Sequence, residues 1–196
     1  MKHEVTSLNT KKMLAASLKR LLRSKSLSKV TVSEIVTDCK VNRKTFYYHF
    51  ENIYVLLRWM LKQEAIEVVK QMDLVTNYEE AIYFVIDYID ENEVILKNIY
   101  HSMGKDELSQ FFHHDLIEVS ASIIEKAAQK NGINAPQDFK DLLSRFYTGA
   151  IASLILEWID NGSISDREKS MQYISLIFHN SITNILKAAE SENAAN

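Results

Sequence analysis

The chain has 196 residues, of which 46% are hydrophobic and 25% are charged, and its formal net charge is −3. These proportions are usual for a globular protein and exclude an intrinsically disordered chain. No apolar run approaches the roughly 18 residues of a membrane span, and the first residues lack the apolar core of a secretion signal. We therefore expect a cytoplasmic protein that has no membrane partner.

Scarce residue types exclude several kinds of chemistry. Cys39 is the only cysteine, so an internal disulfide and a cysteine-based zinc site are ruled out. The four glycines lie far apart, so no glycine-rich phosphate loop can be written with them. His113, His114 and Asp115 lack metal-ligand spacing, and we interpret them as part of a solvated helical face. We expect no cofactor, no metal ion and no enzymatic activity.

Charge is distributed unevenly along the chain. Residues 1–52 hold 11 Lys or Arg and 4 Asp or Glu, a net charge of +7, which leaves −10 for residues 53–196. A basic segment beside an acidic one indicates that the first segment meets a polyanion. We predict two domains with these bounds.

The first domain is predicted to contain three helices. Residues 10–25 place leucines at helical spacing with lysines and arginines on the other faces, as in an amphipathic helix. Thr31 and Glu34 match a capping box at the start of a second helix of about two turns. Asn42 is a good N-cap for a third short helix that ends near residue 50.

Two short helices that meet at a tight corner, supported by a preceding helix, are typical of a helix-turn-helix, whose second helix enters the DNA major groove. Arg and Lys side chains suit guanine, Thr suits thymine, and Tyr and His suit phosphates. A surface turn with solvated charges is the alternative, and the net charge of +7 disfavours it. The predicted DNA-binding residues are Thr31, Arg43, Lys44, Thr45, Tyr47, Tyr48 and His49.

Residues 31–57, TVSEIVTDCKVNRKTFYYHFENIYVLL, resemble the helix-turn-helix signature of the TetR family of bacterial transcriptional regulators. The resemblance implies an all-α fold, in which an N-terminal three-helix domain is joined by a long helix to a larger C-terminal helical bundle. It implies a dimeric, sequence-specific regulator, expected to be a repressor, that binds a pseudo-palindromic operator through residues 42–49. Within that segment residues 43–45 approach bases and residues 47–49 bind phosphates or thymine methyl groups. The matching residues are Thr31, Ile35, Val41, Thr45, Tyr47, His49, Phe50 and Leu56.

Three positions depart from the family pattern. Lys40 stands at the corner where glycine is usual, so either it adopts a left-handed conformation or the corner differs. Asn42 replaces serine and keeps the capping function. Ile53 replaces lysine, which removes one expected phosphate contact.

The second domain is predicted to be entirely helical. A connecting helix is expected over residues 53–73, and the C-terminal tail is expected to fray. Two start signals are Asn77 with Glu80 and Ser165 with Glu168, and the few glycines stand at helix ends. The later helices are expected at residues 78–90, 92–103, 107–130, 136–161 and 166–190.

The last two helices carry apolar stripes that are wider than a one-sided face requires. We predict that they form a four-helix bundle with a second copy, and the alternative is that they lie at the centre of a monomer. The predicted interface residues are Phe146, Ala150, Leu154, Trp158, Ile174, Phe178, Ile182 and Ile185.

The middle helices are rich in aromatic residues. They could line a cavity for a small-molecule effector, and ordinary core packing is the alternative. Residues 42–60 are also similar to the branch of the family that includes activators of dihydroxyacetone kinase operons, which implies a partner protein in place of a small molecule. A co-regulator that acts mainly through such a partner is therefore the alternative function. The aromatic residues are Tyr78, Tyr83, Phe84, Tyr88, Tyr100, Phe111 and Phe112.

Overall fold

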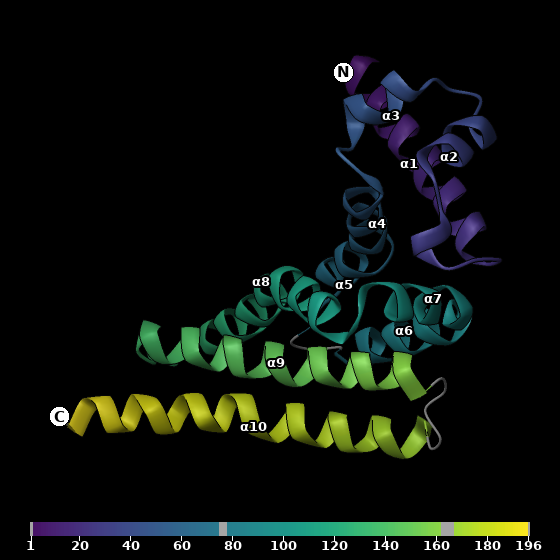
Figure 1. Cartoon of the computed structure of the whole chain (residues 1–196). Helices are drawn as coiled ribbons and strands as arrows, with labels where there is room; N and C mark the ends of the chain where they lie inside the picture. The colour runs from purple at the N-terminus through teal and green to yellow at the C-terminus, as the bar shows by residue number, and fades with distance from the viewer. Residues whose placement is uncertain (1, 75–77, 162–166, 196) are drawn as a thin grey trace.

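A computed structural model of the protein describes residues 2–74, 78–161 and 167–195. All the regular secondary structure in these ranges is helical, which confirms the all-α prediction. Figure 1 shows a small group of helices, α1 to α3, at one end of the molecule and a larger bundle, α6 to α10, at the other. The α4 segment joins the two groups.

The N-terminal helices pack around a small apolar core. Leu14, Leu18 and Leu22 recur every four residues, so they share one face of the first helix, and all three are fully buried. Phe46 of the third helix is also fully buried. The first helix begins earlier than residue 10, where it was expected. The elements are α1 (Lys2–Leu22), the short 3-10 helix η1 (Leu27–Lys29), α2 (Val32–Asp38) and α3 (Arg43–His49).

Side-chain caps set where the short helices begin. The Thr31 hydroxyl accepts a hydrogen bond from the Glu34 amide at 3.3 Å, and the Glu34 carboxylate accepts one from the Thr31 amide at 2.9 Å, so the predicted capping box is confirmed. The Asn42 Oδ1 atom accepts from the Thr45 amide at 2.8 Å, as predicted. Asn52 caps the following helix in the same way.

The corner between α2 and α3 is closed by a left-handed residue that is not glycine. Lys40 has a φ of 54°, the first of the two alternatives considered for this position. Its amide donates to the Thr37 carbonyl at 3.1 Å, and the Val41 amide donates to the Val36 carbonyl at 3.0 Å. This pair of bonds is a Schellman motif, which stabilises the corner even though a β carbon in the left-handed region costs about 1–2 kcal/mol.

The connecting helix is not uniform. The predicted single helix consists of α4 (Ile53–Leu61), a π-helical segment η2 (Lys62–Ile66) and α5 (Glu67–Gln71). The helical path is continuous but ends two residues earlier than expected. The segment contains neither glycine nor proline, so the sequence carries no ordinary signal for the change of register.

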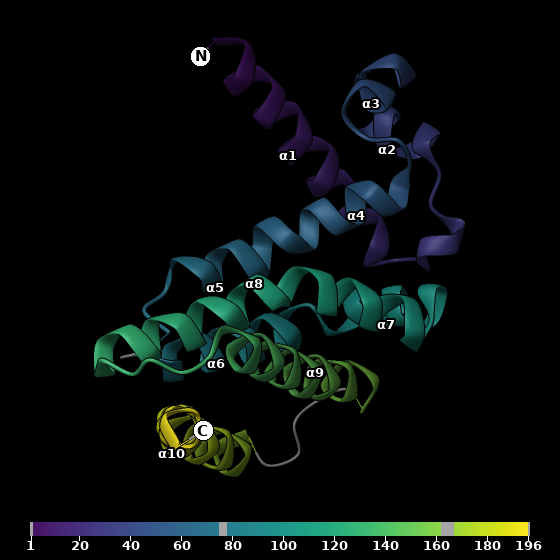
Figure 2. The same ribbon diagram turned by 90° about the vertical axis from the view of Figure 1, so that its left-hand side faces the viewer.

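The C-terminal bundle follows the predicted order. Gly132 ends one helix in the left-handed conformation with a φ of 63°. α9 lies along α8, while α10 packs on α6 and α8 at the outer edge of the bundle in both views (Figures 1 and 2). The helices are α6 (Tyr78–Glu91), α7 (Glu93–Met103), α8 (Lys105–Asn131), α9 (Gln137–Asn161) and α10 (Arg167–Ala195).

Two expectations about helix ends have different outcomes. The C-terminal tail was expected to fray, but α10 continues through it without a break as far as Ala195. The proposed caps at Asn77 and Ser165 lie outside the described residues.

By length and composition alone, one of the described helices, α9, could cross a membrane. No membrane span was expected from the sequence, because charged residues interrupt every apolar run, including the one in α9. Core helices of bundles commonly meet the same criterion. α9 buries Leu143, Ala152 and Leu156 within the protomer, as a core helix does.

The strained corner leads to a stability prediction. Replacing Lys40 with glycine relieves the left-handed strain and keeps the Schellman bonds, so the free energy of unfolding in urea should rise by about 0.5–1 kcal/mol. Lys40→Ala removes the same charge but keeps a β carbon, and it should not stabilise the protein. An equal gain in both variants would mean that charge, and not backbone strain, limits stability at this corner.

Candidate nucleic-acid interface

The third helix of the N-terminal domain has one buried face and one exposed face. Phe46 is fully buried and Phe50 is 3% exposed, and these rings hold α3 against the rest of the domain. On the opposite face, Tyr47 is 56% exposed and Tyr48 is 71% exposed. More than half of the surface of each of these tyrosines is therefore accessible to water.

The remaining predicted DNA-binding residues of α3 are placed in two ways. Arg43 and Lys44 are exposed, whereas Thr45 and His49 are half-buried. The two cations and the two tyrosines therefore form the accessible part of the helix. Thr45 and His49 lie at its margins, where they contact the protein as well as solvent.

The first turn of α3 is held in place by side-chain hydrogen bonds. The Arg43 guanidinium donates through Nη2 to the Ser33 hydroxyl of α2, so it bridges the two helices of the motif. Thr45 Oγ1 lies 3.1 Å from the Asn42 carboxamide oxygen. These bonds fix the start of α3, and in helix-turn-helix proteins it is the first turns of the second helix that reach base edges.

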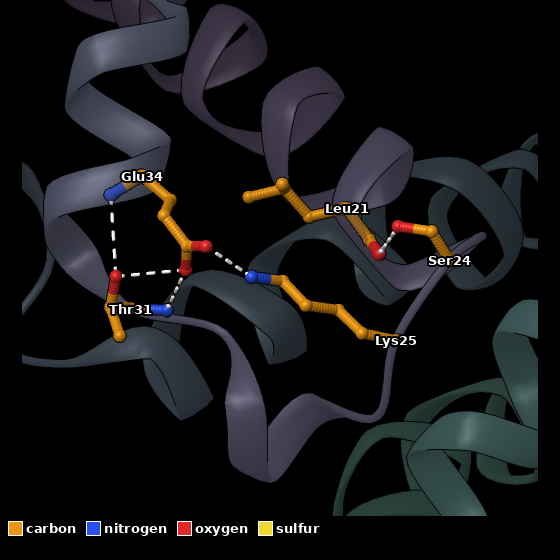
Figure 3. A network of polar contacts seen from close by, with 5 residues as sticks. All are labelled: Leu21, Ser24, Lys25, Thr31 and Glu34. Atoms are coloured by element: carbon orange, nitrogen blue, oxygen red, sulfur yellow. Dashed lines mark hydrogen bonds and ion pairs between the residues drawn. The ribbon is translucent and has the colours of Figure 1, made fainter.

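Thr31 belongs to a polar network at the start of α2 (Figure 3). Its hydroxyl donates to the Glu34 carboxylate at 2.8 Å, and the Lys25 ammonium pairs with the same carboxylate. The Lys25 hydrogen bond, followed by the two from Thr31, lowers the pKa of Glu34 from its ordinary 4.5 to about 2. The sequence did not predict the part played by Lys25, because it lies nine residues from Glu34.

The predicted dimer residues divide into three groups. Phe146 is 68% exposed, Ile185 is 37% exposed, and Ala150 is exposed. Leu154, Trp158, Ile174 and Phe178 are half-buried and line a cavity. Ile182 is 5% exposed because its side of α10 faces the bundle, so it is part of the protomer's own core and is not available to a second copy.

Four further exposed apolar residues on the same two helices were not among the predicted interface residues. The signal was present, since Leu142 precedes Phe146 by four residues and Tyr173 precedes Ile177 by four, which places each pair on one helical face. These residues are Leu142, Tyr173, Leu176 and Ile177, which are 57%, 56%, 61% and 56% exposed. These four residues, together with Phe146, Ala150 and Ile185, are exposed on the two helices, and we call this set of residues the α9–α10 face.

The cavity has a volume of about 150 Å³ and lies among η2, α5, α6, α8, α9 and α10. Of the aromatic residues that were expected to line such a space, Tyr88 and Phe112 do so. Phe111 is buried elsewhere in the core, and Tyr83 is 46% exposed. The side chain of Tyr78 lies outside the described residues.

The suspected polar cluster on α8 has a different role from the one expected. His113 and His114 are exposed, but Asp115 is buried and lies 3.2 Å from the Lys62 ammonium. The interpretation of Asp115 as a solvated residue was therefore wrong, because α8 turns it toward the connecting segment. Within the described ranges, no three His, Cys, Asp or Glu side chains gather as metal ligands.

A helix-turn-helix with an exposed basic and phenolic face, carried on a larger helical bundle, defines a DNA-binding transcriptional regulator. Comparison with known protein families supports this class. Residues 14–59 match the model for bacterial regulatory proteins of the tetR family, and residues 76–188, more than half of the chain, match the model for a transcriptional regulator C-terminal region of the same family. The chain belongs to the TetR family of bacterial transcriptional regulators, as its sequence indicated.

Two relatives extend over most of the chain. The HTH-type dhaKLM operon transcriptional activator DhaS of Lactococcus lactis subsp. lactis (strain IL1403) is 23% identical over 171 residues, which are 87% of this chain and 90% of the relative. A solved structure of the dihydroxyacetone kinase operon activator DhaS has a TM-score of 0.69 and 22% identity, and the match covers 88% of this chain and 96% of that one. The fold is therefore shared along nearly the whole chain. The names of the family and of these relatives describe transcriptional regulators and not enzymes.

The network around Glu34 predicts a pH dependence of stability. Because folding lowers the pKa of Glu34 from 4.5 to about 2, its charge stabilises the folded state above pH 4.5, and this contribution is lost as the pH falls toward 2. Glu34→Gln keeps a capping side chain and removes the charge. The difference in free energy of unfolding between wild type and variant should be constant near neutral pH and shrink between pH 4.5 and 2, as measured by urea denaturation. A difference that does not change over this interval would contradict the assignment.

Proposed function

We propose that the protein acts as a homodimer and binds a pseudo-palindromic operator, with residues 42–49 of each protomer in the major groove. The observation that carries the proposal is the face of α3, where two cations and two phenols are exposed on a helix anchored by Phe46 and Phe50. Such a surface suits a DNA groove, because cations meet phosphates and guanine while the phenols donate to phosphate oxygens. A cytoplasmic location follows from this target.

The charge distribution supports the same partner. The net charge of +7 on residues 1–52 attracts the phosphate backbone, and the net charge of −10 on residues 53–196 repels it. DNA is thus drawn to one end of the molecule. We retain these two segments as the proposed DNA-binding domain and the proposed effector-binding and dimerisation domain.

The α9–α10 face supports the homodimer. Its large apolar side chains are more than half exposed in the single chain, with the exception of Ile185. Large apolar side chains that are exposed on a helix pair favour a partner that covers them, and two copies of a helix pair can form a four-helix bundle. A two-fold dimer would place the two α3 helices one DNA turn apart, about 34–36 Å. Ala150 lies within this face and allows close helix approach.

Repression is the primary proposed outcome of operator binding. A co-regulator that activates an operon through a protein partner is the second candidate, and the similarity over 87% of the chain to a relative named as an operon transcriptional activator favours it. Transcription from a reporter that carries the operator, measured with and without the protein, separates the two. A fall in transcription supports repression, and a rise supports activation.

Base-reading and phosphate-binding residues should differ in their effects on operator affinity. Arg43→Ala should cost about 1–3 kcal/mol on the cognate operator and alter the preferred sequence. Lys12→Ala, at an exposed position of α1, should weaken all duplexes equally and reduce the salt dependence by about 0.9 in the slope of log K against log salt concentration. Fluorescence anisotropy on operators selected from a random pool measures both effects. Equal losses on every sequence for Arg43→Ala would argue against a base-reading role.

The α9–α10 face should control the oligomeric state. Phe146→Glu places a charge at the centre of the proposed interface, so light scattering at micromolar concentration should give the mass of one chain instead of two. Val94→Glu is the matched control, because Val94 is 58% exposed on α7, away from that face. Wild-type protein that is monomeric under these conditions would remove the dimer from the proposal.

A further inference from the structure

The cavity in the C-terminal bundle is lined almost completely by hydrocarbon. Its wall includes aliphatic side chains from η2, α5, α6, α8, α9 and α10, and none of the lining residues is charged. Tyr88, Ser120 and Trp158 are the lining residues whose side chains carry polar atoms. A cavity of about 150 Å³ is large enough for a benzene-sized molecule.

Both hydroxyl groups in the wall already have partners. Ser120 accepts a hydrogen bond from the Thr148 hydroxyl at 2.9 Å, and the Tyr88 hydroxyl donates to Glu64 Oε2 at 3.0 Å. A charged ligand would lose its hydration in this cavity without gaining a counter-charge, which is costly. An uncharged apolar ligand would lose nothing comparable. The chemistry of the wall therefore selects small, neutral, hydrocarbon-like molecules.

Tyr88 connects the cavity to the DNA-binding domain. Tyr88 lines the cavity, and its hydroxyl bonds to Glu64 of the π-helical segment. The same Glu64 oxygen lies 2.6 Å from the ammonium of Lys19, which belongs to α1. That ammonium also lies 5.7 Å from the centre of the Tyr88 ring. A single side chain thus separates the cavity from a helix of the DNA-binding domain.

The π-helical segment is where these contacts converge. Leu61, Ala65 and Ile66, at and beside this segment, line the cavity, while Glu64 reaches α1 and Lys62 pairs with the buried Asp115 of α8. π-helical turns are rare and are often found at functional sites. The irregular turn therefore presents apolar side chains to the cavity and polar side chains to the neighbouring helices.

We propose that the cavity binds a small, uncharged, apolar ligand, and that Tyr88, Glu64 and Lys19 couple its occupancy to the position of α1. The ring of tyrosine is rigid, so a ligand that displaces it moves the hydroxyl by a similar distance. A hydrogen bond of 3.0 Å is lost when its atoms separate beyond about 3.5 Å. Glu64 and Lys19 then lose the Tyr88 side chain as a shared neighbour, and α1 loosens. The C-terminal end of α1 stays held, because the Asn98 side chain donates a hydrogen bond to the Leu22 carbonyl at 2.8 Å.

Burial and the nearby Glu64 carboxylate raise the pKa of Tyr88, so the hydroxyl keeps its proton and remains a donor at neutral pH. The consequence of the coupling for transcription rests on the proposed function. The binding site and the loosening of α1 do not, because both can be measured without DNA.

Toluene and benzoate are suitable probes, since they share a ring and differ in charge. Calorimetry should detect binding of toluene to the full-length protein and no binding of benzoate. Hydrogen exchange of the α1 amides around Lys19 should become several-fold faster when toluene saturates the wild-type protein. The absence of toluene binding, or equal binding of benzoate, would overturn the assigned ligand class.

Two variants test the coupling. Tyr88→Phe keeps the ring in the cavity wall and removes the hydroxyl, so it should bind toluene while exchange in α1 no longer responds. Glu64→Gln, at a partly exposed position, removes the charge that holds Lys19 and should give the same loss of response. The control is Lys70→Gln, because Lys70 pairs with Glu118 between α5 and α8 and does not touch α1; it should respond as wild type does.

An unchanged response in both Tyr88→Phe and Glu64→Gln would overturn the coupling, even if toluene binds. Failure of the protein to bind any operator would instead refute the proposed function and leave these results standing. The two proposals therefore fail in different experiments.

Discussion

The burial of Phe46 beneath α3 is the contact on which the DNA-binding surface depends. This ring lies 5.4 Å from Tyr47 and 6.2 Å from Phe50, measured between ring centres, and Phe50 lies 5.8 Å from Trp59 of α4. A helix of seven residues has little stability of its own, because helix nucleation is costly and few backbone bonds follow it. Tertiary packing must therefore hold α3, and the same aromatic chain also ties it to the connecting helix.

The position of α3 has a second determinant in the polar contacts of its first turn. Asn42 caps the helix, and Arg43 reaches Ser33 on α2. Because the apolar contacts hold one side and these bonds hold the start, the exposed cations and phenols are presented on a nearly rigid frame. Side chains that are already ordered lose less entropy when they bind, which favours specific recognition.

Local signals in the sequence were sufficient to predict where the short helices of the N-terminal domain begin. The capping box at Thr31 and Glu34 and the cap at Asn42 depend on residues within three positions of one another, and each can be read from the chain directly. At Lys40 the sequence left two conformations open, and the structure shows the left-handed one. The resemblance to a known family added predictions of the overall fold and of the face of α3 that approaches DNA. The predicted bounds of the C-terminal helices followed from cap residues and from glycines at helix ends.

The features that the sequence did not predict depend on residues far apart in the chain. Asp115 is buried, and its carboxylate is paired with Lys62, which lies 53 positions earlier in the chain. The apolar stripes of α9 and α10 were correctly recognised as too wide for one face, but spacing alone cannot tell which part lines a cavity and which part faces solvent. Phe146 faces solvent, whereas Ile182 is packed in the protomer's own core. The π-helical segment has no composition of its own, so only the folded chain reveals it.

The π-helical segment also determines where the connecting segment can change in length. Five residues occupy a turn that an ordinary helix would complete with about four, so deletion of one codon between positions 62 and 66 would restore regular α-helical geometry. Because the wide turn already absorbs the extra residue, this deletion would leave the helices before and after it in nearly the same relative orientation. A deletion in α4 or α5 would instead rotate everything before it by about 100° relative to the bundle and shift it by about 1.5 Å. In the proposed dimer, such a rotation would point both recognition helices away from their grooves, so a single-residue deletion should be tolerated better within the π-helical segment than on either side of it.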